Sequence, residues 1–128
     1  MRQVGRTWTL VSLVTFLAVP VVGALAADEH AAAKDTTVQG EVLDLACYVG
    51  HGAKGAGHAE CAKSCLKGGQ PMGLLAADGT VYVLMADHQN GAPYDQAKGF
   101  AGKTVEIKGE VATQGSMKGI TVHAVAAK

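Results

Sequence analysis

The strongest constraint on the fold of this chain is an alternation of apolar and polar residues over residues 104–113. One parity is apolar or small and the other is charged: Val105, Ile107, Gly109 and Val111 against Glu106, Lys108 and Glu110. Side chains alternate between the faces of a β-strand, so this pattern predicts a strand with one buried face. Turn residues follow at 114–116, and a closing strand is expected to place Ile120, Val122 and Ala124 inward, with His123 on its other face.

Three further segments carry strand signals. Residues 72–77 and 80–85 are apolar runs joined by Asp78-Gly79, the dipeptide most typical of a tight β-hairpin. Met72 and Met85 lie in these runs and are expected to pack in the core. Residues 36–49 also look extended, and their apolar residues change parity near Val42-Leu43, which predicts a β-bulge or a bend that lets one strand serve two sheet faces.

Helical patterns separate these strands. Residues 57–67 have helical apolar spacing and end at Gly68-Gly69, and residues 94–100 predict a second short helix or turn. The glycine-rich residues 50–57 and the polar residues 87–93 are expected to be loops. Five strands with a helix between the third and the fourth is the element order of an OB-fold barrel. The sequence therefore predicts a mainly β fold: a five-stranded OB-like barrel with two short helices.

Two stretches of sequence strengthen this interpretation. Residues 102–111, followed by 119–122, resemble the last hairpin of small exported bacterial OB-fold proteins, and residues 40–44 resemble their first strand. The resemblance implies an OB-like domain over residues 37–128. A plain OB barrel does not need the Cys- and His-containing helical insertion at residues 47–69, so this segment is the place to look for function.

The N-terminal residues have the features of a secretory signal peptide. Arg2 and Arg6 precede an apolar run over residues 8–22, and small residues at Ala24 and Ala26 suit cleavage. We expect residues 1–26 to be the signal peptide and residues 27–36 to be a flexible leader. The protein would then be exported, periplasmic or secreted, without a membrane segment after cleavage; an uncleaved anchor is the alternative.

Charge excludes one class of partner for the exported chain. Both arginines lie within residues 1–26, so the remainder carries nine lysines against eleven acidic residues and no arginine. Nucleic-acid binding needs a basic surface, usually with arginine or stacked aromatic rings. We therefore expect no nucleic-acid partner.

Cysteine and histidine residues gather in the insertion as C-x₃-H-x₆-H-x₂-C-x₃-C: Cys47, His51, His58, Cys61 and Cys65. Helical spacing puts His58, Cys61 and Cys65 on one helix face, and Cys47 is expected at the end of the first strand, facing them. Three thiolates and an imidazole suit a soft metal ion, with His51 as a substitute donor. The predicted function is metal binding or carriage, of copper first and zinc second.

Other functions of these cysteines stay open. A disulfide from Cys47 to Cys61 or Cys65 would leave one free thiol and would suit a protein-interaction module, with another exported protein as its partner. A Cys61–Cys65 disulfide would strain a helix, whose Cβ atoms four residues apart are about 5–6 Å apart rather than about 3.5–4.5 Å. Thiol redox chemistry is a third possibility, and no catalytic residues are assigned. Haem attachment is excluded because C-x-x-C-H is absent.

Overall fold

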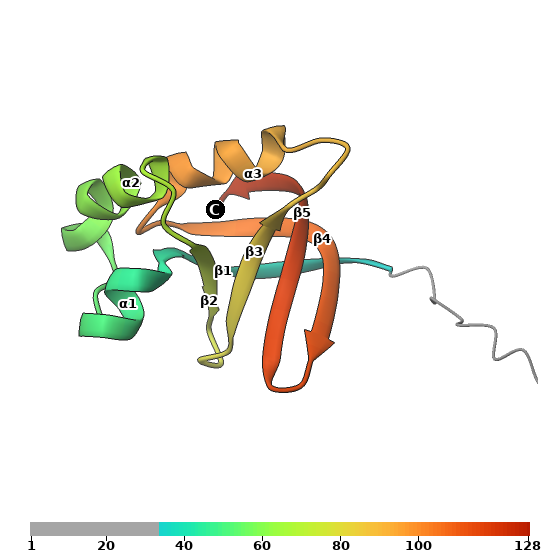
Figure 1. Cartoon of the computed structure of the whole chain (residues 1–128), viewed down its shortest axis with the longest axis horizontal. Helices are drawn as coiled ribbons and strands as arrows, with labels where there is room; N and C mark the ends of the chain where they lie inside the picture. Colours follow the sequence, from blue (N-terminus) through green and yellow to red (C-terminus); the bar gives the residue numbers. More distant parts are fainter. Residues whose placement is uncertain (1–33) are drawn as a thin grey trace, which may run out of the picture.

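The computed structural model describes residues 34–128, so the predicted signal peptide and residues 27–33 of the leader lie outside the described residues. Five strands form a closed barrel in the order β1-β2-β3-β5-β4 (Figure 1). In chain order the elements are β1 Asp35–Asp44, α1 Leu45–His51, a 3₁₀ turn Ala56–His58, α2 Ala59–Lys67, β2 Met72–Ala76, β3 Val81–Ala86, α3 Ala92–Ala97, a 3₁₀ turn Lys98–Phe100, β4 Thr104–Gln114 and β5 Met117–Ala127.

This architecture confirms the predicted OB-like barrel with a helical insertion. The strand β1 pairs with two neighbours: its start pairs with β4 and its end pairs with β2, both antiparallel. A parallel pairing of β3 with β5 closes the barrel. The helices α1 and α2 lie together at one end of it, where β1 ends (Figure 1). No helix within residues 34–128 is both long enough and apolar enough to cross a membrane.

Both predicted hairpins are present. Asp78 accepts a hydrogen bond from the Thr80 N–H at 2.9 Å, and Gly79 has a φ of 84°, so this pair makes the tight turn between β2 and β3. Alternation in β4 is also confirmed, because Val105 and Ile107 are fully buried in the core. The core continues into the helices through the buried side chains of α2 and α3, namely Ala62, Leu66 and Ala97.

The closing strand β5 differs from the prediction at its bulge. Lys108 pairs with Ala124, but the next residue of β4, Gly109, pairs with Val122, so His123 is an extra residue. A bulge reverses the side-chain parity beyond it. Ala124 is therefore exposed rather than inward, and Val125 packs against the core.

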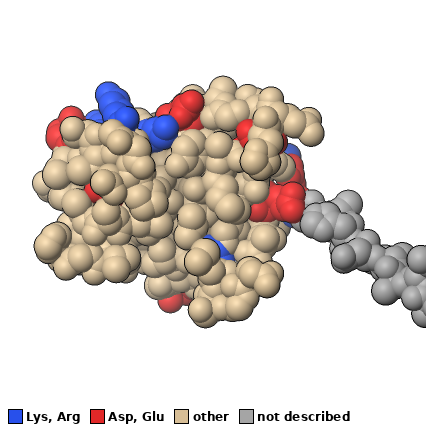
Figure 2. Space-filling model, viewed as in Figure 1, with Lys and Arg blue, Asp and Glu red and all other residues tan. Residues whose placement is uncertain are grey.

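His123 at this bulge links two acidic residues of other segments. Its Nδ1 lies 2.7 Å from Asp35 of β1, and its Nε2 lies 3.5 Å from Asp87 after β3. Figure 2 shows acidic side chains gathered beside the start of β1. Asp35 and Thr36 had been assigned to the flexible leader, but they belong to β1 because they pair with β4.

The opening strand is shorter than predicted. It ends at Asp44, and residues 45–51 form α1 rather than continuing the strand to 49. Two caps explain the change: the Asp44 side chain accepts from the Ala46 N–H, and Gly52 closes the helix with a φ of 67°. No bulge lies at Val42-Leu43, because pairing with β2 runs through these residues without interruption. Pairing with β4 ends just before them, at Glu41, and both Val42 and Leu43 are buried, so their change of parity reflects the exchange of β4 for β2 as the partner of β1.

Met85 is a further correction in β3. Met72 is fully buried as expected, whereas Met85 is 39% exposed. Leu84 of the same strand is the residue that faces the core, so Met85 falls on the outer face of the barrel.

Candidate metal centre

Three donor side chains converge where the barrel meets its helical insertion. One donor atom each from Asp44, Cys47 and His58 lies within 4.8 Å of the other two, so the group could hold a metal ion. Asp44 is the last residue of β1, Cys47 lies in the first turn of α1, and His58 ends the 3₁₀ turn before α2. The chain therefore brings the three together by turning sharply twice within fifteen residues.

Asp44 is the buried anion of the group. Its side chain is almost fully buried, at 1% exposure, and its Oδ1 accepts from the Ala46 N–H at 2.9 Å. Burial acts to raise the pKa of Asp44, but the Cys47 thiol, the Ala46 N–H and the Cys65 thiol outweigh it and hold the pKa below 3.8. The carboxylate is therefore ionised at neutral pH. Its second oxygen, Oδ2, is buried without a hydrogen-bond partner.

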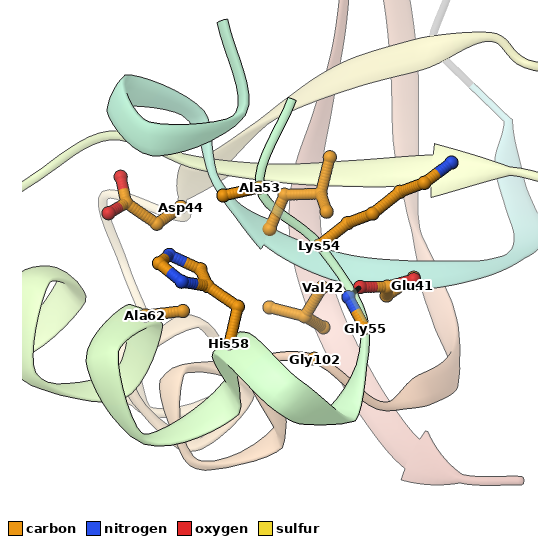
Figure 3. Close-up of a pocket in the computed structure, with 10 residues that line it drawn as sticks. Glu41, Val42, Asp44, Ala53, Lys54, Gly55, His58, Ala62 and Gly102 are labelled. Carbon is orange, nitrogen blue, oxygen red and sulfur yellow. Dashed lines mark hydrogen bonds between the residues drawn. The ribbon is translucent and has the colours of Figure 1, made fainter. Parts of the chain in front are cut away.

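His58 supplies a second buried atom without a partner. Its Nε2 is buried and accepts or donates no hydrogen bond. Figure 3 shows the imidazole ring beside the Asp44 side chain, in a pocket that both residues line. This pocket has no room for a water molecule. Each residue thus has a buried polar atom without a partner, and the pocket that both line has no room for a water to supply one, which costs free energy.

The loop before His58 is held from the barrel side. The Glu41 carboxylate accepts from the Gly55 N–H, and the Gly55 carbonyl accepts from the His58 N–H at 3.0 Å. Gly102 lets this loop approach, because a Cβ there would lie 2.8 Å from the Gly55 carbonyl oxygen and 2.9 Å from Ala59. These contacts fix the position from which the imidazole of His58 projects (Figure 3).

The three cysteines are all free thiols, in different surroundings. The Asp44 carboxylate, with burial adding to it, raises the pKa of Cys47 to about 12. Burial, and then Asp44 and Cys61, raise the pKa of Cys65. Both the Asp44 carboxylate and Cys61, which is exposed to solvent, are thus close enough to Cys65 to act on its thiol.

The structure thus treats the predicted donors differently. Cys47 and His58 belong to the converging group, and Cys65 lies beside it. Cys61 is exposed on α2, and His51 is exposed at the end of α1. Cys47 is a helix residue rather than the end of a strand, because Asp44 begins α1.

Asp44 is the donor that the sequence prediction missed. An aspartate followed by a short helical segment is a typical N-cap, and this signal would have placed Asp44 three residues before Cys47 at the same turn. No protein-family model, curated protein or solved structure matches this chain, so the candidate site rests on its own geometry.

Proposed function

We propose that this protein binds a metal ion through Asp44, Cys47 and His58, with Cys65 as the fourth donor. The observation that carries the proposal is that Asp44 and His58 lie in one group with the Cys47 thiol, and each has a buried side-chain atom without a hydrogen-bond partner, Oδ2 and Nε2 respectively. A cation bound by this group would give both side chains a partner. It would also balance the negative charge of the buried carboxylate, which no lysine or histidine pairs with among the described residues.

The spacing of the three donor atoms suits this role. Tetrahedral zinc has bonds of about 2.0–2.1 Å to nitrogen or oxygen and about 2.3 Å to sulfur, which places its ligand atoms roughly 3.3–3.8 Å apart. The donor atoms lie within 4.8 Å of one another. Small side-chain rotations are therefore enough to close the group around an ion, with no change in the path of the backbone.

The donor types favour zinc over copper. Cu(I) prefers soft thiolate and thioether donors, whereas Zn(II) accepts sulfur, imidazole nitrogen and carboxylate oxygen together. The sequence alone predicts a thiolate-rich site, which suits Cu(I) or Zn(II), and ranks copper first only by analogy with exported bacterial thiol-imidazole sites. With a carboxylate in the group and Cys61 exposed, the donor set becomes one oxygen, one nitrogen and two sulfurs, which suits zinc better.

The signal-peptide features of residues 1–26 support action in an exported compartment. There the protein would hold or carry zinc rather than catalyse a reaction. Four protein donors would fill the tetrahedral coordination of the ion and leave no position for a substrate. The small domain also gains from the ion, because metal binding stabilises the folded state by mass action.

Zinc titration of the full chain, purified under reducing conditions, tests the proposal. We expect about one zinc ion per chain by elemental analysis and calorimetry. Asp44→Asn retains the cap oxygen but loses the charge, and it should weaken binding by about tenfold or more, as should Cys47→Ser and His58→Ala. His88→Ala removes an exposed histidine and is the matched control, with unchanged affinity expected.

The result that contradicts the proposal is equally clear. Absence of stoichiometric zinc in the reduced chain, together with a disulfide by intact mass in chain purified without reductant, would favour the interaction module in which a disulfide fastens α2 to the barrel. Equal losses of affinity in His88→Ala and His58→Ala would show that histidines bind zinc without a built site.

A further inference from the structure

The helix α2 exposes a second row of sulfur beside the proposed metal centre. Cys61 and Cys65 are four residues apart and therefore share a helix face. Exposure falls along the row: Cys61 is exposed, Cys65 is partly buried, and Asp44 beside it is 1% exposed. Exposure to solvent thus decreases from Cys61 through Cys65 to the Asp44 carboxylate.

We propose that Cys61 is the thiol that first receives the metal ion for this centre, an inference that rests on the proposed function. It takes the metal ion from an anionic thiol compound or thiol-bearing protein in solution and passes it through Cys65 to Asp44, Cys47 and His58. Cys61 is thus a positioning and transfer residue, bound to the ion only on the way in or out, and the resting site does not include it.

Sulfur spacing makes the transfer possible. Cβ atoms four residues apart on a helix are about 5–6 Å apart, and two thiolates on one ion have sulfurs roughly 3.8 Å apart, which flexible cysteine side chains can reach. Cys65 is close enough to both Cys61 and Asp44 to interact with each. An ion held by Cys61 and Cys65 therefore already lies next to the carboxylate. Without Cys61, the ion would have to be received by the partly buried thiols of Cys47 and Cys65.

Each step is a ligand exchange without electron transfer. The ion arrives on the thiolates of its donor; Cys61 forms a metal–sulfur bond as one bond to the donor breaks. The proton of the Cys61 thiol moves to the thiolate that is released. The same exchange then repeats inward: Cys65 and then Cys47 each form a metal–sulfur bond and lose the thiol proton, and one of these protons passes to the released Cys61 thiolate while the other leaves to solvent. The charge of the ion does not change.

The surroundings of Cys61 indicate the charge of the donor. The pKa of Glu60, the residue before Cys61, is lowered mainly by its contact with Lys63 and further by Lys67 and Lys103. Lysine side chains are seen on the side of the molecule where α2 lies (Figure 2). Thiolate complexes of zinc are anionic, and these lysines would attract them.

Transfer kinetics test the proposal. Zinc is presented to the metal-free, reduced full chain as its glutathione complex, and zinc bound to protein is measured after rapid separation. Cys61→Ser should slow uptake by about tenfold or more, while its equilibrium affinity for zinc stays within about threefold of wild type. Ser64→Ala removes an exposed hydroxyl group one turn from Cys61 without removing a sulfur, and should leave the rate unchanged.

Three results would overturn the proposal. An unchanged uptake rate in Cys61→Ser would remove the receiving role while leaving the metal site intact. A loss of affinity as large as that of Cys47→Ser would make Cys61 a ligand of the resting site. Failure of the wild-type chain to hold zinc at equilibrium would defeat the proposed function itself, and the transfer role with it.

Discussion

Replacing His58 with leucine should change protein stability in opposite directions with and without zinc. In the metal-free protein, His58 Nε2 is buried without a partner. An unsatisfied buried polar atom costs about 1–3 kcal/mol, and this residue is only partly buried, so we expect the lower end. No capping bond is lost, because the His58 side chain makes none to α2. His58→Leu should therefore stabilise the metal-free protein by about 1 kcal/mol.

Zinc should reverse the order. A ligand at about 100 times its dissociation constant stabilises the folded state by about 2.7 kcal/mol. The wild type should gain this amount and the variant almost none, so the wild type becomes more stable by about 1.7 kcal/mol. For a domain of this size, the gain corresponds to a rise of about 1–3 M in the urea midpoint.

Urea unfolding of both proteins, in a chelator and in excess zinc, measures all four stabilities. A reductant keeps the thiols free throughout. The reasoning fails if His58→Leu destabilises the metal-free protein by more than about 1 kcal/mol, because Nε2 would then have a partner. It also fails if zinc raises both midpoints equally, because the ion would then act elsewhere.

Gly109→Ala should destabilise the barrel by about 3 kcal/mol in urea unfolding, because its Cβ would lie 1.9 Å from the backbone oxygen of Thr121; an unchanged midpoint would contradict the bulge geometry. In reduced, metal-free protein, iodoacetamide should modify Cys61 well before Cys47, whose pKa of about 12 keeps its thiol protonated, and peptide mass spectrometry showing equal rates would refute this. His123→Ala should return the pKa of Asp35, lowered mainly by the hydrogen bond to His123, toward 3.8 in a carbon-13 NMR titration. Because the folded pKa is the lower one, Asp35 stabilises the wild type above pH 3.8, and this contribution is lost as pH falls through the lowered pKa.

The strands of the barrel were predictable where local chemistry decides them. Asp78-Gly79 makes its turn through short-range geometry, and the alternation around Ile107 is complete within one strand. The bulge at His123 was not predictable in this way, because it depends on how β5 pairs with β4 across the sheet. Ala124 and Val125 exchange faces for that reason alone.

The helix α1 was missed because its apolar residues have the spacing of a strand. Leu45, Cys47 and Val49 alternate with a period of two, α1 buries none of its residues, and only the caps at Asp44 and Gly52 indicate a helix. Those caps are visible in the sequence, so this part of the error was avoidable.

The candidate site was predicted by donor chemistry but not by depth. The spacing of Cys61 and Cys65 shows that they share a helix face, yet one is exposed and the other partly buried. The burial of each cysteine depends on how α2 packs beside the end of β1, and no local sequence pattern gives that packing. Asp44 gained its role from the same packing, because the end of β1 is buried beneath the helical insertion.

X-ray absorption at the zinc edge of the loaded, reduced protein tests the central claim most directly. The account predicts a mixed first shell, with sulfur at about 2.3 Å and nitrogen or oxygen at about 2.0–2.1 Å, and loss of part of the light-atom shell in Asp44→Asn. A shell of sulfur alone, or a shell that Asp44→Asn and His58→Ala leave unchanged, would contradict it.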